Sequence, residues 1–323
     1  MLTGLDHIII GVHNLEHAAR IFSEKLGLTV SGGGTHPSGG TANRIIVIGD
    51  TYLELIAVRE PAEAQRSMLA RLALGEGYLN FALVSDDIAR DSEDMQRRGV
   101  KIVGPDAGAL TSAEGRTRRW SRTNVERPDL AQHCPFLIQH DSLGEERRAR
   151  LAGWQTPPEH PLGATAVLST TIAVADLAEA TERFQHIYGL QASDPFSGEV
   201  DAWDATLVAF LLQGDLQSFE LATPLPTFLD PSDATQYMPE PGAFAAYLQR
   251  FGEGLCRITL AVDSMERARD YLDKHNVVYT YREERHPALW IHPDESCGAS
   301  LVLHEFTPEI PPSMPLDYEG TDL

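Results

Sequence analysis

A fourfold repeat of one strand–helix–strand pattern constrains the fold of this 323-residue chain more than any other feature. Segments 15–28 and 177–190 are the clearest pair of copies, with leucine, phenylalanine, glycine and leucine at identical offsets. The apolar residues of both segments follow helical spacing, and Asn14 and Asp176 precede them as N-caps. Weaker copies have strands at 80–84 and 257–262, each followed by a helix. Because further strand-like runs follow every helix, the pattern predicts four βαβββ units.

Charge and composition restrict the function. The net charge of −21 would repel nucleic-acid phosphates, so we expect no nucleic-acid partner. No apolar run reaches the ~18 residues of a membrane span, and the N-terminus lacks the features of a signal peptide. Three cysteines without CxxC spacing favour reduced thiols. We therefore expect a cytoplasmic protein with no membrane association and a small-molecule substrate, and a possible homodimer is left open.

Three segments carry a family resemblance. LDHIIIGVHNLEHAARIF (5–22), followed by YLELIAV (52–58), resembles the opening module of the vicinal oxygen chelate superfamily. GGTHPSGGTANRIIVIGDTYLELI (33–56) resembles more narrowly its glyoxalase-like proteins, and PEHPLGATAVLSTTIAVADL (158–177) resembles the way that group enters its second half. The resemblance implies an α+β fold in which four βαβββ modules pair into two cupped mixed β-sheets. It does not define the reaction, because the superfamily includes dioxygenases, isomerases, lyases, epimerases and metal-free binding proteins.

The pairing of modules implied by the resemblance divides the chain. We place the first glyoxalase-like domain, with modules 1 and 2, at 1–145 and the second domain, with modules 3 and 4, at 164–310. Residues 146–163 between them are rich in arginine and proline and are typical of a linker. The C-terminal tail, 311–323, is expected to be extended.

Four strand positions facing the first cup are the family's metal-ligand positions. By resemblance these are His7, Glu54, Asn80 and Gln139. Such a set suits a divalent ion such as Mn²⁺ or Mg²⁺, whereas Zn²⁺ or Fe²⁺ would prefer a second imidazole. The alternative is that His7 and Glu54 form a hydrogen-bonded polar pair without metal.

The corresponding positions of the second domain are Ser169, Glu220, Arg257 and Glu305. His304 replaces Glu305 if the strand register differs by one residue. Since arginine is always charged and has no lone pair to give, we expect no metal here and an ion pair between Arg257 and Glu220 or Glu305. This pattern argues against a ring-cleaving dioxygenase, whose second half carries a site of two histidines and one carboxylate.

A glycine-rich loop at 32–44 has five glycines around His36 and is not a P-loop, because no GK[ST] follows. We predict that it forms one wall of the ligand site, with His36, Thr41 and Asn43 binding substrate. The alternative is an ordinary connection between strands.

One face of a predicted strand carries four side chains at every second position: Arg116, Arg118, Trp120 and Arg122. Arg118 and Trp120 are candidates for holding a substrate carboxylate. The alternative for this face is solvated surface.

The leading functional hypothesis is a metal-assisted lyase or isomerase that abstracts a proton from a small substrate with adjacent oxygens. Glu54 would be the base or a metal ligand, and His36 an acid–base residue. The alternative is a non-catalytic, sequestering protein of the bleomycin-resistance type, which the acidic composition favours. The pairing of His7 with Glu54 favours the enzyme.

Overall fold

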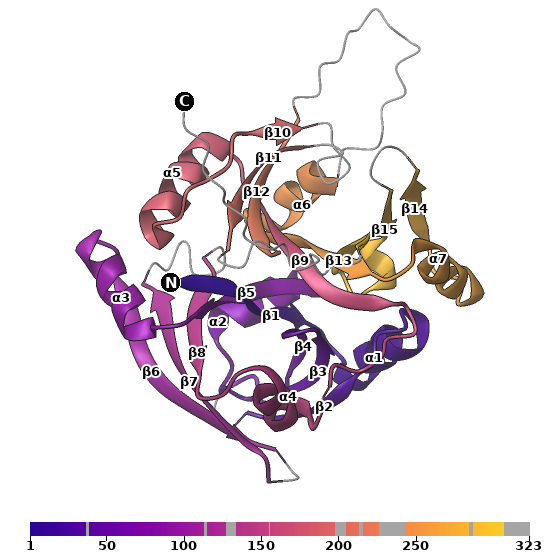
Figure 1. Ribbon diagram of the computed structural model, residues 1–323, viewed down its shortest axis with the longest axis horizontal. Coiled ribbons are helices and arrows are strands. Elements are labelled where there is room, and N and C mark those ends of the chain that lie inside the picture. Colours follow the sequence, from indigo (N-terminus) through magenta and orange to yellow (C-terminus); the bar gives the residue numbers. More distant parts are fainter. Residues whose placement is uncertain are drawn as a thin grey trace, which may run out of the picture.

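Two eight-stranded mixed sheets, flanked by helices, make up the computed structural model, in agreement with the predicted α+β fold (Figure 1). It describes residues 1–36, 39–112, 115–126, 134–154, 156–197, 205–212, 216–225, 243–283 and 287–306. The predicted tail lies outside these ranges. None of the helices within them has the length and apolar character that crossing a membrane would require.

The first sheet is built from the two modules of the N-terminal half. In spatial order its strands are β2 (Ser31–Thr35), β3 (Thr41–Ile48), β4 (Thr51–Val58), β1 (Leu2–Gly11), β5 (Gly77–Ser85), β8 (Phe136–His140), β7 (Thr117–Val125) and β6 (Ile102–Thr111). Its helices are α1 (Leu15–Arg20), continued by the π-helical η1 (Ile21–Lys25), then α2 (Arg66–Ala73) and α3 (Ile88–Arg97). β1 runs parallel to β4 and antiparallel to β5, so the modules join through their first strands. Asn14 caps α1 as predicted, accepting a hydrogen bond from His17 N.

The second sheet repeats this order with the C-terminal modules. Its strands are β10 (Phe196–Ser197), β11 (Ala205–Leu211), β12 (Ser218–Pro224), β9 (Ala164–Ala173), β13 (Gly254–Val262), β16 (Ser300–Glu305), β15 (Ala288–Ile291) and β14 (Tyr279–Arg282). Its helices are α5 (Leu177–Tyr188), α6 (Ala243–Phe251), α7 (Met265–Lys274) and the 3-10 turn η3 (Pro293–Glu295). Asp176 caps α5, which ends at Gly189 in the left-handed conformation, φ 69°. A glycine is favoured there because it has no Cβ to clash.

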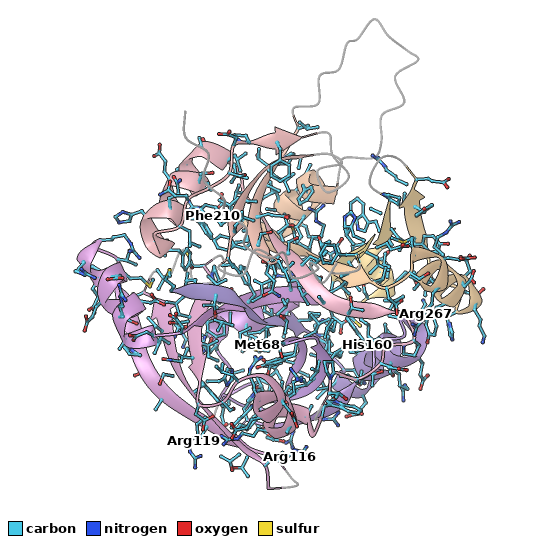
Figure 2. The ribbon with its side chains drawn as sticks, in the orientation of Figure 1. Met68, Arg116, Arg119, His160, Phe210 and Arg267 are labelled. Atoms are coloured by element: carbon cyan, nitrogen blue, oxygen red, sulfur yellow. The ribbon has the colours of Figure 1, made fainter. Side chains whose placement is uncertain are left out.

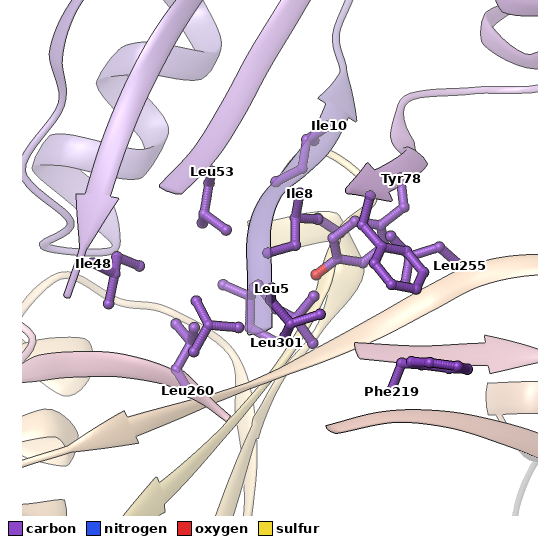
Figure 3. Packing of buried hydrophobic residues seen from close by; sticks show 14 of the residues in the cluster. Leu5, Ile8, Ile10, Ile48, Leu53, Tyr78, Phe219, Leu255, Leu260 and Leu301 are labelled. Atoms are coloured by element: carbon purple, nitrogen blue, oxygen red, sulfur yellow. The ribbon is translucent and has the colours of Figure 1, made fainter. Parts of the chain in front are cut away.

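The two sheets pack back to back around one continuous apolar core. Figure 3 shows Leu5 and Ile8 of the first sheet facing Leu260 and Leu301 of the second. The rings of Phe81 and Phe219 lie 6.2 Å apart across this boundary. The apolar faces of both sheets are therefore removed from water by each other as well as by the helices.

The segment predicted as a linker contains a helix, α4 (Gly144–Ala152), on the concave side of the first sheet. It lies against β2, β3 and β7 (Figure 1). Leu151 of α4 packs on Ile45 and Tyr52. The arginines and prolines of this stretch predict a linker, but the buried Leu151 makes its first part an amphipathic helix.

The rest of that segment ties the two halves together. His160 accepts a hydrogen bond from Thr29 N at Nδ1 (2.8 Å) and donates from Nε2 to Val47 O (2.9 Å). Its carbonyl accepts from Arg267 of α7 (2.9 Å; Figure 2). Through these hydrogen bonds, His160 links the connecting segment to both halves of the chain.

Candidate functional site

A bulge in β1 brings two consecutive polar residues to the concave side of the first sheet. The pairing of β1 with β5 shifts by one residue between Leu5 and His7, and Asp6 is the extra residue. His7 stacks on the Tyr52 ring, with centroids 4.8 Å apart. Asp6 beside it is buried and reaches α4 and β8. The bulge therefore adds a carboxylate that strict alternation would have turned into the core.

Asp6 is the centre of a buried charge network. Its carboxylate accepts hydrogen bonds from His7 Nδ1 (2.7 Å) and Arg147 Nη2 (2.6 Å), and His140 Nε2 lies 3.3 Å away. Burial alone would raise the pKa of Asp6, but the charges of Arg147 and His140 and the hydrogen bonds hold it well below the usual range. Since an ionised carboxylate only accepts, His7 Nδ1 carries a hydrogen. This arrangement orients His7 Nε2 toward Glu54.

Glu54 of β4 is an ionised, buried carboxylate. Burial opposes its ionisation, yet the hydrogen bond from His36 and the charges of His7 and His36 lower the pKa of Glu54 to about 2. Asn43 Nδ2 donates to its Oε1 (2.5 Å), and His36 Nε2 is 3.4 Å from the same oxygen. His7 Nε2 lies 3.8 Å from Oε2, within ion-pair range but beyond a hydrogen bond. The alternative of a directly hydrogen-bonded His7–Glu54 pair is therefore wrong.

The glycine-rich hairpin delivers the remaining members of this cluster. His36 Nδ1 lies 2.8 Å from Thr41 Oγ1, and Asn43 Oδ1 accepts a hydrogen bond from Gly34 N (2.8 Å). Gly33 has φ 140°, and a Cβ there would come within 2.1 Å of Asn43 O, so this close approach of β2 to β3 requires glycine. The side chain of His36 is 22% exposed, whereas Asn43 is fully buried. His36 is thus the member of the cluster that a ligand reaches most easily.

The other two predicted metal ligands are engaged elsewhere. Asn80 donates to Cys134 O (3.1 Å) and accepts from Phe81 N (2.8 Å). Gln139 accepts from Ile88 N (3.1 Å) and donates to Asp86 O (2.6 Å) at the start of α3. By strand alternation, His140 and not Gln139 faces the concave side.

The predicted four-ligand set is accordingly not assembled. Only His7 and Glu54 of that set face each other across ion-pair distance. Over the part of the chain that the structure describes, no three His, Cys, Asp or Glu side chains converge to hold a metal ion. The donors present do not make a preformed site for a divalent ion, which needs about four or more ligands, including waters.

Two arginines of β7, Arg118 and Arg122, face the cup rather than bulk solvent. Arg118 is 8% exposed, and the Arg122 guanidinium stacks on the Phe136 ring at 3.9 Å. Trp120, between them on the same face, lies 6.3 Å from the His140 ring. Arg119 points the other way and its side chain is 65% exposed (Figure 2). The predicted alternation is present, and the alternative of a solvated face is wrong for Arg118.

The second sheet carries a different set of groups. Glu220 Oε2 accepts a hydrogen bond from Thr171 Oγ1 (2.6 Å) and lies 3.4 Å from Arg257 Nη2. The predicted ion pair of Arg257 is confirmed, with Glu220 as partner. Glu305 accepts from Met265 N (2.8 Å) at the start of α7, as Gln139 does for α3. His304 is therefore the residue of β16 on the concave side.

A cleft of about 450 Å³ opens on the opposite, helix-covered face of β3. Arg44 and Arg59 line it, but Arg44 pairs with Glu16 and Arg59 donates to Thr35 Oγ1 (2.9 Å). Neither His7 nor Glu54 lines this cleft. The titratable cluster and the cleft thus lie on opposite faces of one hairpin.

Asp6, His140 and Arg147 are polar residues of the site that the sequence reading missed. The bulge that turns Asp6 to the concave side depends on pairing with β5, and Arg147 reaches Asp6 across 141 positions of the chain. His140 directly follows Gln139, and neighbouring strand residues face opposite sides. The prediction that Gln139 faces the cup therefore excluded His140.

Comparison with known proteins agrees with this architecture. The glyoxalase-like domain family matches residues 5–188, more than half of the chain. A hypothetical protein from Staphylococcus aureus shares the fold, with TM-score 0.61 and 14% identity over 94% of this chain and 99% of that protein. A mutant of 4-hydroxymandelate synthase from Streptomyces coelicolor superimposes with TM-score 0.58 and 14% identity, over 94% and 93% of the two chains. No curated protein sequence matches the chain. At these identities the structures show the fold alone, and the match over residues 5–188 shows that the chain belongs to the glyoxalase-like domain family.

Proposed function

We propose that this protein is an enzyme that binds a small molecule with adjacent oxygens beside the first sheet and moves a proton on it, with His36 as the acid–base residue. The observation that carries the proposal is the contact of His36 with the buried, ionised Glu54. A histidine oriented by a fixed carboxylate is a recurrent arrangement for proton transfer. The exposed part of His36 gives a ligand access to it.

The two residues take different roles. A pKa of about 2 makes Glu54 a weak base at neutral pH, because the best general base has a pKa near the working pH. Glu54 is better suited to orient His36 through Nε2 and to stabilise the imidazolium once it forms. Nδ1, which lies against Thr41 Oγ1, is then the nitrogen that takes the proton when a ligand displaces that contact.

The divalent ion implied by the family resemblance has a limited place in this proposal. Among the predicted ligands it would find His7 Nε2 and a Glu54 oxygen, and the amides of Asn80 and Gln139 would have to leave their backbone partners. When bound, such an ion would polarise a substrate oxygen. No step assigned to His36 or Glu54 depends on it.

A non-catalytic binding protein is the second candidate. The observation that favours it is the closure of the cup: α4 covers the concave side, and His7 and Glu54 are 5% and 6% exposed. Such a protein would hold its ligand without chemical change.

Hydrogen–deuterium exchange on candidate substrates separates the two functions. The protein would be incubated in D₂O with dihydroxyacetone, hydroxyacetone and pyruvate, and loss of the carbon-bound proton beside the carbonyl followed by ¹H NMR. We expect exchange above background with the unmodified protein and a loss of roughly 10²–10⁴-fold in His36→Gln. Glu54→Gln should lose activity too, whereas His17→Gln on the exposed side of α1 should not.

Two results would count against the enzyme. Exchange at an undiminished rate in His36→Gln would remove His36 from the reaction. Saturable binding of one of these compounds without any exchange would favour the binding protein.

A further inference from the structure

Arg118 is a buried cation, and one of its hydrogen-bond donors is unsatisfied within the part of the chain that the structure describes. Only 8% of it is exposed, and its buried Nη1 has no partner among the described residues. The centroid of the Trp120 ring lies 5.8 Å from its guanidinium carbon, at the edge of cation–π range, and the ring gives Nη1 no hydrogen-bond acceptor oxygen. A guanidinium remains charged at any physiological pH, and a charge buried without a partner is unfavourable. The position is therefore suited to an anion that the chain itself does not provide.

A narrow hollow of about 10 Å³, room for about one water molecule, lies beside Arg118, so a larger anion must displace side chains to enter it. The hollow lies between α4 and the hairpins of the first sheet, and its lining includes Gly33, Ile45, Ser112, Arg116, Arg118 and Arg150. Arg150 comes from α4 and is held by Asp141 (2.9 Å) and Glu146. Arg116, Arg118, Arg150 and Ser112 therefore line one hollow, and guanidiniums are favoured donors for carboxylate and phosphate oxygens.

The hollow adjoins the cluster around Glu54. Ile45, which lines it, is paired with Glu54 across β3 and β4. Gly33, also in the lining, precedes Gly34, whose N–H bonds Asn43. Asn43 and Ile45 share one face of β3 because they are two residues apart. A group bound at Arg118 is accordingly on the same side of the sheet as His36 and Glu54.

We propose that Arg118, supported by Arg116 and Arg150, binds an oxyanion of the ligand, so that the ligand is a small carboxylic acid or phosphate ester. The placement of this ligand next to His36 rests on the proposed function, but the oxyanion site does not. With a net charge of −21 the protein repels anions in general, and a local group of arginines is what would let one bind here.

Calorimetric titration with two probes tests the site and distinguishes its two chemistries. Pyruvate represents a carboxylate with an adjacent oxygen, and inorganic phosphate represents a phosphate ester. We expect saturable binding of at least one of them, weakened by salt, and a loss of roughly tenfold or more in Arg118→Gln. Arg118→Lys, which keeps the charge but not the fork of donors, should bind with intermediate affinity. Arg119→Gln is the matched control, because it removes the neighbouring arginine on the exposed face.

Stability measurements keep the test independent of folding. Without ligand, Arg118→Gln should melt at the same or a higher temperature, since it removes an uncompensated buried charge. Absence of saturable binding in the unmodified protein, or equal losses in Arg118→Gln and Arg119→Gln, would overturn the proposal. His36→Gln should still bind the probes saturably, with a smaller loss of affinity than Arg118→Gln shows. Failure of the exchange experiment with this binding intact would therefore reject only the catalytic role.

Discussion

At the scale of single residues, the two buried carboxylates of the first sheet are stabilised in opposite ways. Asp6 is surrounded by Arg147 and two imidazoles, which give it full charge compensation. Glu54 has Asn43 as a neutral donor and His36 and His7 at longer distances. The first arrangement suits a structural ion pair. In the second arrangement the negative charge of Glu54 is only partly neutralised, so Glu54 can still attract a ligand or a protonated histidine.

This difference predicts how acid affects stability. The folded pKa of Glu54, about 2, lies below its ordinary value of 4.5. Between these values the unfolded chain binds more protons, so the contribution of Glu54 is complete above pH 4.5 and is lost as the pH falls toward 2. Its size is on the order of 3 kcal/mol. In urea titrations the unmodified protein should lose more stability between pH 5 and pH 3 than Glu54→Gln does. The exposed Glu93→Gln should behave as the unmodified protein, and equal pH dependence in Glu54→Gln would contradict the assignment.

At the scale of secondary-structure elements, helix α4 has the largest effect on the site, because it covers the cup and adds two arginines to it. It connects the two halves, covers the concave side of the first sheet and supplies Arg147 to Asp6 and Arg150 to the hollow beside Arg118. Apolar contacts of Leu151 with Ile45 and Tyr52 hold it there. A helix in this position makes the cup a closed site rather than an open groove.

The ion pair between α4 and β1 provides a test of this docking. Arg147→Met should lower the free energy of unfolding by about 3–5 kcal/mol, because it removes the closest cation from a buried carboxylate. Asp6→Asn introduced into that variant should recover part of the loss, since the uncompensated charge is then gone. Urea denaturation of both single variants and the double variant measures the coupling. Strictly additive losses would show that α4 is not held by this pair.

At the scale of the whole molecule, the two sheets share one apolar core and are joined by hydrogen bonds between the halves. The Tyr78 hydroxyl of β5 donates to Ser300 O of β16 (2.7 Å), and Tyr188 of α5 donates to Pro135 O (2.7 Å). Together with the shared apolar core, these hydrogen bonds leave neither sheet with a complete core of its own (Figure 3). Domains with such an interface are expected to unfold together.

Hydrogen exchange at increasing denaturant can measure this cooperativity. Peptides from β1 and β13 should lose protection at the same denaturant concentration. Tyr78→Phe should lower that concentration equally for both, by the equivalent of about 1 kcal/mol. Tyr279→Phe, which removes an exposed hydrogen bond to Asp273, serves as control. Loss of protection in one sheet before the other would show that the halves are independent.

The local pattern of the sequence was enough to predict the repeat, the family resemblance, and helices α1 and α5. Helical spacing and capping residues predicted α1 and α5, because these signals act within a few positions of the chain. His7 and Glu54 could be placed on one face of the first sheet since they sit on adjacent strands of one module. The glycines of 32–44 predict a wall of the ligand site, whereas the close approach of β2 to β3 at Gly33 is known only from the structure.

Tertiary structure alone decided the rest of the site. A strand has a period of two, so only the pairing of β8 determined that His140 faces the cup and Gln139 caps α3. Asp6 turns toward the site because a bulge forms against β5, and no local pattern announces it. Arg147 and Arg150 lie in a stretch whose composition is typical of a linker, and α4 docks there only because the sheet provides Asp6 and an apolar surface. Contacts between residues far apart in the chain depend on how whole elements pack, and that information is absent from any short segment.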